Sequence, residues 1–394
     1  MSISNGSYFF ALALFAGMNT AIADQEPPAW ITEGPYVDEA LYAIELPVET
    51  IANKLYVEVV IGGEPKRLVF DTGSPSMISR ELAAELGLDA VDSVQGRDSH
   101  GAVLRSDIVQ TDLTLDGITF HRVPIFAADF SSSRAAQCIL ADGVLGSEIL
   151  PLCSLQIDLA DSAIRCNSSL DGLDHIADAA KQPLYDFGYP HAPFFDVRFA
   201  KKAVSKVMFD TGSPGLFTIS PPDYEGANRA RGVGRTIEGY GSLGASLGGQ
   251  APADEQRRAE LPTLTVGNVD FGRVIATVRE SPPSLLGASV VDQFVVTLDP
   301  ESGSAYFHEY RDTPIERGEF GFSLAFGDEI SVALVWEGSV ADAAGIRAGQ
   351  RIEAINGVPT DTSCDGIERS LLAMEKDTIE IELRGRTVTL DRAN

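Results

Sequence analysis

The pentapeptide DTGSP occurs twice in this sequence, at residues 71–75 and 210–214, 139 residues apart. Three further segments recur after it in the same order, as the pairs LTLDGITF 113–120 with LTVGNVDF 264–271, VLGSEIL 144–150 with LLGASVV 285–291, and the stretches that begin at residues 155 and 295. A tandem duplication is the economical explanation, because four segments recur in the same order and the offset from Gly146 to Gly287, 141 residues, is within two of the first. We therefore expect two equivalent lobes.

Each copy consists mainly of short β-branched and aromatic runs that are interrupted by Gly, Asn, Asp and Pro, a pattern typical of strands and turns. The run LYVEVVIGGEPKRLVF at residues 55–70 predicts a strand, a turn and a second strand that ends just before Asp71. One short helix is predicted from Arg80 to Leu86, with Gly87 as its stop signal. The predicted fold class is therefore mostly β.

The repeat also suggests domain boundaries. We predict a first lobe at residues 41–167, a second lobe at 194–311 and a proline-containing connection between them at 168–193. Residues 316–394 have a different pattern and are predicted to form a separate small α+β module. Its expected elements are a strand in EISVALVW, a helix in SVADAAGI, a strand in QRIEAINGV, a helix in GIERSLLAME and a strand pair in TIEIELRGRTVTL.

Asp71 and Asp210 are the candidate catalytic residues, because equivalent residues of duplicated lobes can meet at a pseudo-two-fold axis. Two carboxyl groups that share one proton can activate a water molecule and protonate a peptide carbonyl, so they can hydrolyse peptides without a metal or a covalent intermediate. Two like charges about 3 Å apart do not both ionise, so the pair is expected to titrate as a unit.

The neighbours of the two aspartates are predicted to support them. Thr72 and Thr211 are expected to hydrogen-bond across the axis, and Gly73 and Gly212 to let backbone N–H groups approach the carboxylates. Ser74 and Ser213 are expected to donate to the outer carboxylate oxygens.

The two motifs VF-DTGS with VLG, and MF-DTGS with LLG, resemble those of the aspartic peptidases of the retropepsin and pepsin kind. The resemblance covers roughly residues 50–310. It implies two acid-protease β lobes, catalytic roles for Asp71 and Asp210, a protein or peptide substrate and no cofactor. The short lobes look closer to a fused pair of retropepsin-like units than to a eukaryotic pepsin.

By position in such a family, Gly-rich hairpins that cover the substrate are expected at residues 96–103 and 239–249, and Tyr240 is the candidate flap residue. The five histidines show no partner spacing and are interpreted as surface or loop residues. The G-x-G-x-x-G and G-x-S-x-G matches near Gly244 lack a βαβ or strand–turn–helix context and are interpreted as accidents of a Gly-dense loop.

The C-terminal module resembles a PDZ domain of the bacterial protease-associated type, through FGFSLAFGD followed by VALVWEGSVADAAGIRAGQRIEAINGV. The resemblance implies that a peptide adds to a sheet edge and that its C-terminal carboxylate is held by backbone groups. These groups are expected at Gly321, Phe322, Ser323 and Leu324. A module that packs or dimerises without binding a peptide is the alternative.

Together these features predict an aspartic endopeptidase whose PDZ-like module recruits or gates the substrate. The competing hypothesis is a catalytically inactive peptide-binding protein that uses the PDZ-like module. A net charge of −27 argues against nucleic acid as a partner, since phosphate backbones are repelled.

Export to the periplasm or the exterior is predicted, because an apolar run and Ala21-Ile22-Ala23 resemble a signal peptide over residues 1–23. No later stretch is long and apolar enough to predict a membrane span. The four cysteines lack metal-site spacing, and no metal site is predicted. Cys153 and Cys166 bracket a predicted hairpin and could pair, with Cys138 an equal competitor for either.

Overall fold

The computed structural model describes residues 2–3, 27–200, 203–311 and 318–393. The predicted signal peptide, residues 1–23, lies outside the described residues apart from strand β1 (Ser2–Ile3), which pairs in parallel with β23 (Val269–Val278). Within the described ranges, no helix has the length and apolar character needed to cross a membrane.

Both copies of the repeat fold in the same way, which confirms the predicted mostly-β, two-lobed class. In the first lobe, β6 (Glu64–Phe70) leads to Asp71, pairs with β5 (Lys54–Ile61) and runs parallel to β11 (Gly143–Leu145). In the second lobe, β17 (Ala203–Asp210) pairs with β16 (Pro193–Ala200) and runs parallel to β24 (Leu285–Gly287). The repeated hydrophobic-hydrophobic-Gly segments therefore lie directly beside the strands that end at the two aspartates.

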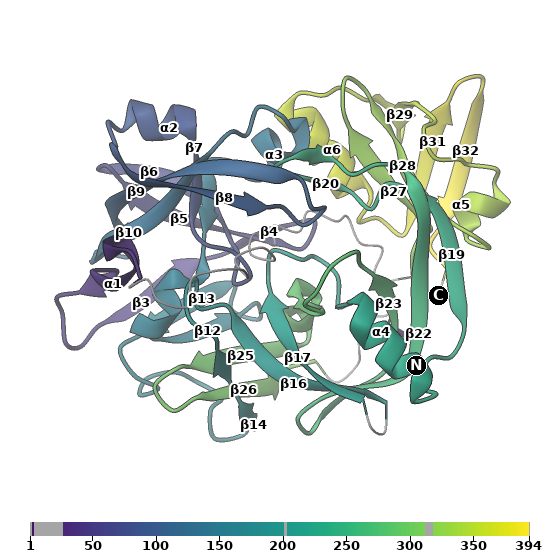
Figure 1. Cartoon of the computed structure of the whole chain (residues 1–394). Helices are drawn as coiled ribbons and strands as arrows, with labels where there is room; N and C mark the ends of the chain where they lie inside the picture. Colours follow the sequence, from purple (N-terminus) through teal and green to yellow (C-terminus); the bar gives the residue numbers. More distant parts are fainter. Residues whose placement is uncertain (1, 4–26, 201–202, 312–317, 394) are drawn as a thin grey trace.

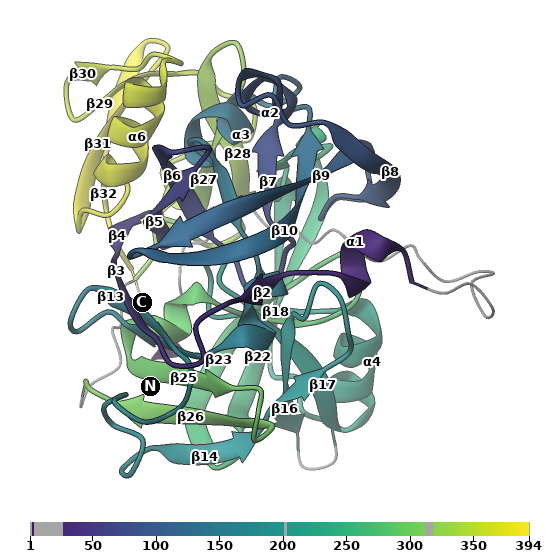
Figure 2. The ribbon, with the colours of Figure 1, turned by 90° about the vertical axis from the view of Figure 1, so that its left-hand side faces the viewer.

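Each lobe is built on one large sheet (Figures 1 and 2). The remaining strands of the first sheet are β2 (Tyr36–Val37), β4 (Glu49–Ile51), β7 (Met77–Ser79), β8 (Ala90–Arg97), β9 (Val103–Leu115) and β10 (Ile118–Ala128). The remaining second-lobe strands are β15 (Tyr185–Asp186), β18 (Phe217–Ile219), β19 (Thr236–Gly241) and β22 (Asp254–Val266), with a small separate hairpin of β20 (Ala245–Ser246) and β21 (Gly249–Gln250).

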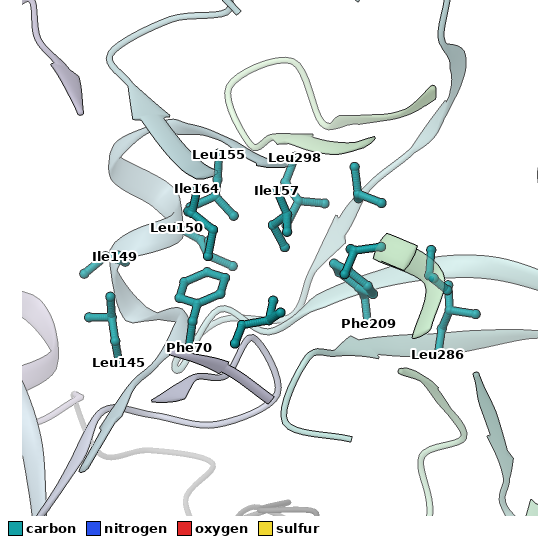
Figure 3. Close-up of a cluster of buried hydrophobic side chains, with 14 of the residues drawn as sticks. Phe70, Leu145, Ile149, Leu150, Leu155, Ile157, Ile164, Phe209, Leu286 and Leu298 are labelled. Atoms are coloured by element: carbon teal, nitrogen blue, oxygen red, sulfur yellow. The ribbon is translucent and has the colours of Figure 1, made fainter. Parts of the chain in front are cut away.

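A third sheet joins the lobes, because β12 of the first lobe pairs antiparallel with β25 of the second. Its strands, in spatial order, are β14 (Ala180–Pro183), β26 (Ser304–Glu309), β25 (Phe294–Asp299), β12 (Ser154–Asp158), β13 (Ala163–Asn167) and β3 (Ala43–Pro47). The 168–193 segment thus contributes strands of its own and is more than a bare connection. Figure 3 shows Phe70 and Phe209, the residues just before the two aspartates, in one buried cluster over this sheet.

The helices are short. The predicted helix after the first DTGSP motif is confirmed as α2 (Arg80–Glu85), which begins at the N-cap Ser79, whose Oγ accepts a hydrogen bond from Leu82 N at 3.0 Å. The others outside the C-terminal module are α1 (Ala29–Thr32), α3 (Arg134–Ile139), α4 (Pro221–Arg229) and the 3₁₀ helices η1 (Ser147–Leu152) and η2 (Ala288–Asp292).

The C-terminal module has the predicted order of elements. They are β27 (Phe322–Phe326), β28 (Ile330–Trp336), α5 (Val340–Ala343), β29 (Ile352–Ile355), β30 (Val358–Pro359), α6 (Cys364–Ala373), β31 (Thr378–Leu383) and β32 (Arg386–Asp391). The module is joined to the second lobe, because β28 pairs antiparallel with β19 and so extends the sheet of that lobe (Figure 1).

Two disulfides include all four cysteines. Cys153 pairs with Cys166 across β12 and β13, one of the pairings left open by the sequence. Cys138 on α3 pairs with Cys364 at the start of α6, which links the first lobe to the C-terminal module across 226 residues.

Candidate active site

Asp71 and Asp210, which we call the dyad, meet in the interior between the two lobes. The adjacent threonines interlock the loops symmetrically: Thr72 N donates to Thr211 Oγ1 at 3.0 Å, and Thr211 N donates to Thr72 Oγ1 at 3.1 Å. Each hydroxyl in turn donates to the opposite lobe, Thr72 Oγ1 to Phe209 O at 2.7 Å and Thr211 Oγ1 to Phe70 O at 2.8 Å. These four bonds hold the two aspartate-bearing strand ends at a fixed separation.

Glycine is required beside each aspartate because the carboxyl group of the opposite lobe lies against it. A Cβ atom at Gly212 would stand 2.1 Å from Asp71 Oδ2, and one at Gly73 would stand 2.5 Å from Asp210 Cγ. Gly73 N also donates to Asp71 Oδ1 at 2.9 Å. Any side chain at either position would therefore push the dyad apart.

The electrostatics of the dyad favour a shared proton. Burial, followed by the neighbouring Asp210, raises the pKa of Asp71 well above its ordinary value, and burial raises the pKa of Asp210. Neither oxygen of Asp210 has a hydrogen-bond partner among the described residues. Two buried carboxylates this close repel each other, so one proton held between them is the favoured state of the pair.

The two serines of the motif depart from the prediction. Ser74 Oγ donates to Pro75 O at 2.9 Å and not to Asp71, and Ser213 Oγ is buried with no hydrogen-bond partner among the described residues. The serine backbones instead anchor the loops: Ser74 O accepts from Ser147 N at 2.9 Å, and Ser213 O accepts from Ala288 N at 2.7 Å. The prediction that these hydroxyls donate to the dyad was therefore wrong: the Ser74 hydroxyl donates within its own loop, and the Ser213 hydroxyl has no partner among the described residues.

A buried lysine lies next to the dyad. Lys54, at the start of β5, is only 4% exposed, and its Nζ donates to Gly212 O of the second lobe. Burial lowers its pKa to about 8, while Asp71 and Asp210 act in the opposite direction and favour its charged form. The adjacent Asn53 donates to Pro214 O at 3.0 Å, so this turn of the first lobe clamps the second DTGSP loop.

Two hairpin tips meet in the regions predicted to be Gly-rich flaps, and both line a pocket together with Leu285, which pairs with Met208 just before Asp210. The first lies between β8 and β9 and the second between β19 and β22. They meet at Asp98, whose Oδ2 accepts from Ser246 Oγ and from Gly248 N, the latter at 3.0 Å. Asp71 and Asp210 are 2% and 0% exposed, so part of the chain must move before a substrate can reach them.

Tyr240 does not lie in a flap tip. It belongs to β19, between β22 and β28, and its side chain is 58% exposed, whereas its neighbour Gly239 packs on Trp336. The tip residue His100 is, by contrast, largely buried, and burial lowers its pKa. His100 therefore lies in a loop, as predicted, but it is not a surface residue.

Gly321 lies just before β27, and Phe322, Ser323 and Leu324 are the first residues of that strand. Their role in binding a peptide carboxylate stays a prediction. Gly321 has φ of +77°, and its carbonyl accepts from Trp336 N at 2.9 Å. The groove between β27 and α6 is not open, however. The small pocket that remains there is also lined by α3 and the second flap tip, with the residues Ala135, Ile139, Leu243, Gly244, Ala245, Gln250, Ser323, Leu324, Phe326 and Leu371.

Four residues of this centre were not predicted from the sequence: Lys54, Asp98, His100 and Arg279. Arg279 is 7% exposed and influences Asp210, whose pKa it helps to lower against the effect of burial. One signal was available for Lys54 and Arg279, because each is a cation in one copy of the repeat and has no charged counterpart in the other. The counterparts are Pro193, by distance from Asp210, and Ala128, by the offset of 151 that relates Leu113 to Leu264.

Two parts of the sequence match known protein families. Residues 57–149 match a family model described as aspartyl protease, and residues 331–385 match a PDZ domain model. No curated protein matches the sequence. Among solved structures, the aspartic proteinase from Irpex lacteus is similar over 68% of this chain and 97% of its own, with 12% sequence identity and a TM-score of 0.41.

The family matches fall on the first lobe and on the C-terminal module, and the second lobe repeats the fold and the motifs of the first. The chain therefore combines a duplicated unit of the aspartyl protease kind with a C-terminal PDZ domain.

Proposed function

We propose that the protein is an aspartic endopeptidase that hydrolyses extended segments of proteins between its two lobes. The observation that supports this most strongly is the dyad itself: two buried carboxyl groups, one from each lobe, which lie against the glycines of each other's motifs and both have raised pKa values. A structural turn would not need this arrangement, because buried like charges are costly unless they share a proton.

In the proposed reaction, the ionised carboxyl group accepts a proton from a water molecule as the water oxygen attacks the peptide carbonyl carbon. The protonated carboxyl group donates its proton to the carbonyl oxygen, and the amine leaves after it has been protonated. No covalent intermediate forms with the chain. The threonine bonds and the two glycines keep the carboxyl groups in place throughout, so little reorganisation is needed.

We propose that the PDZ domain gates the active site and is not a freely open recruiting module. Strand β19 of the second flap pairs with β28, and the flap tip together with α3 lines the PDZ groove. A C-terminal peptide that entered this groove would have to displace these segments. Peptide binding there would therefore change the position of the second flap.

We also propose that the protein is exported and works in the periplasm or outside the cell. All four cysteines form disulfides, which persist in oxidising compartments and are rare in the cytosol.

The test uses purified protein and unfolded casein across pH 3–7. Asp71→Asn is expected to lower kcat about 100- to 10,000-fold, since it removes one partner of the proton shuttle. Asp89→Asn, a change at an exposed residue of the same lobe, is the matched control and is expected to retain wild-type activity. Cleavage that survives Asp71→Asn and is unaffected by pepstatin would refute the proposal.

The rival hypothesis, an inactive peptide-binding protein, makes a different prediction. It requires no cleavage by the wild type and binding of C-terminal peptides that Asp71→Asn leaves unchanged. Its weakness in this fold is that the PDZ groove is covered by the chain's own segments.

A further inference from the structure

A pocket lies beside Asp210, beneath the tip of the first flap. It is lined by Ser99, His100, Thr218, Leu243, Thr277, Arg279, Glu280 and Leu285. Leu285 pairs with Met208, two residues before Asp210, and both flap tips contribute to the walls. A substrate residue next to the scissile bond would therefore place its side chain in this pocket.

The pocket contains polar groups that the chain itself leaves unpaired. Ser99 Oγ and His100 Nε2 are buried and have no hydrogen-bond partner among the described residues. Arg279 donates from Nη1 to Pro283 O at 2.8 Å and forms no salt bridge with any residue in the described ranges. Burying a guanidinium group without a carboxylate partner is costly, and a chain with net charge −27 has many carboxylates that could have paired with it.

Arg279 is one of several buried charges of the centre. The dyad, when it shares one proton, and Asp98 each carry one negative charge, and Lys54 and Arg279 are the buried cations. The Asp98 carboxylate accepts from Ser246 Oγ and Gly248 N of the second flap tip and does not pair with Arg279. Glu280, the remaining charged residue of the lining, is exposed at the rim and is not paired with Arg279 within the described residues.

We propose that this pocket is a substrate subsite that binds a carboxylate, with Arg279 as its specificity-determining residue. The inference rests on the proposed peptidase function and adds a substrate class to it: peptides with Asp or Glu at one of the two residues that flank the scissile bond. Arg279 binds the carboxylate through its free N–H groups, and Ser99 and His100 of the closed flap complete the contact. A C-terminal carboxylate would supply the same chemistry and is separated from a side chain by the test.

The test compares peptides that differ only by Glu or Gln at each of these two positions, each made with a free and with an amidated C-terminus. For one position, the wild type is expected to have a kcat/KM at least about 10-fold higher for Glu than for Gln, as a charge-assisted pair provides. Arg279→Gln should reduce this ratio to about one or below, and Arg279→Lys should keep part of it. Arg273→Gln, in strand β23, which ends one residue before Arg279, is the charge-matched control, because Arg273 pairs with Glu260 outside the pocket; it should keep the wild-type ratio.

Two results would overturn the inference: a wild-type ratio of one or less at both positions, or a loss in Arg279→Gln that is equal for Glu and Gln peptides. The second would mean that Arg279 acts only on the charge of Asp210. A preference that follows the free C-terminus and not the side chain would assign the carboxylate to the peptide end.

Binding measurements separate this inference from the proposed function. The same Glu and Gln peptides are titrated into Asp71→Asn and into Asp71→Asn with Arg279→Gln, and the affinity ratio is compared. If the wild type cleaves no peptide, the peptidase proposal fails, and the affinity ratio still decides whether the pocket selects a carboxylate.

Discussion

Glu148 offers a stringent test of the electrostatics beneath the active-site loops. It is the second residue of η1 and is 1% exposed, and its Oε2 accepts a hydrogen bond from Ser76 N at 3.0 Å. Its Oε1 is buried with no hydrogen-bond partner among the described residues. Burial raises the pKa of Glu148 to about 7, although the bonds from Ser76 act in the opposite direction.

The sign of the effect on stability follows from this shift. Unfolding returns the pKa of Glu148 from about 7 to its ordinary value of 4.5, so between these pH values the folded protein binds more protons than the unfolded chain. The stability contributed by protonated Glu148 is fully present below pH 4.5 and is lost as the pH rises through 7. At 1.36 kcal/mol per pH unit, the loss is about 3 kcal/mol by pH 8.

Glu148→Gln keeps an oxygen that can accept from Ser76 N and carries no charge at any pH. The free energy of unfolding of this variant minus that of the wild type is therefore expected to rise by about 3 kcal/mol between pH 4.5 and pH 8. Urea titrations at several pH values measure this difference, and taking the difference removes the contribution of the dyad, which titrates in both proteins. Glu301→Gln, at an exposed residue, is the control and should show no such trend. A difference that stays constant with pH would refute the reasoning.

Two further predictions concern the contacts between lobes. Replacing Cys138 and Cys364 by serine removes a disulfide between cysteines 226 residues apart, so the free energy of unfolding should fall by about 5 kcal/mol. Replacing Cys153 and Cys166, which are 13 residues apart, should lower it by about 3 kcal/mol. Urea titrations that give the reverse order would contradict this. Asp98→Ala removes the acceptor that joins the two flap tips. The amide hydrogen of Gly248 should then exchange with solvent about 10- to 100-fold faster in a hydrogen-exchange experiment. An unchanged exchange rate would show that Asp98 does not hold the two tips together.

The repeat predicted the core of the fold because its hydrophobic residues have one role in both copies. Phe70 and Phe209 enter the same cluster, and the segments ending at Gly146 and Gly287 pair beside them. Local patterns of this kind determine which strands form and which face is buried. The position of the dyad follows, since equivalent strands of equivalent lobes end at the axis.

The charged surroundings of the dyad could not be predicted in the same way. Lys54 reaches Gly212 across 158 residues of sequence, and Asp98 reaches Ser246 across 148. A strand pattern shows that Lys54 begins β5 but not which loop of the other lobe its ammonium group meets. The prediction for the serine hydroxyls was wrong for the same reason. Whether such a hydroxyl donates to the dyad or to its own loop depends on backbone geometry that the motif does not encode.

The differences between the copies carry information that the similarities do not. The offset between equivalent residues is 139 at Asp71 and Asp210, 151 at Leu113 and Leu264, and 141 at Gly146 and Gly287. The second copy therefore has 12 extra residues around its flap, and the first has 10 extra residues in the stretch that contains α3.

The two regions that contain these extra residues, the second flap and the α3 segment, are also the regions that meet the PDZ domain. The second flap contains β19, which pairs with β28, and α3 carries Cys138, which is bonded to Cys364 on α6. The shared part of the repeat thus builds a symmetric dyad, while the longer region of each lobe adds one wall of the PDZ groove. Because the two walls come from different lobes, any ligand that opens the groove must move one lobe's flap relative to the other lobe's helix, and this is the physical basis on which the PDZ domain would control access to Asp71 and Asp210.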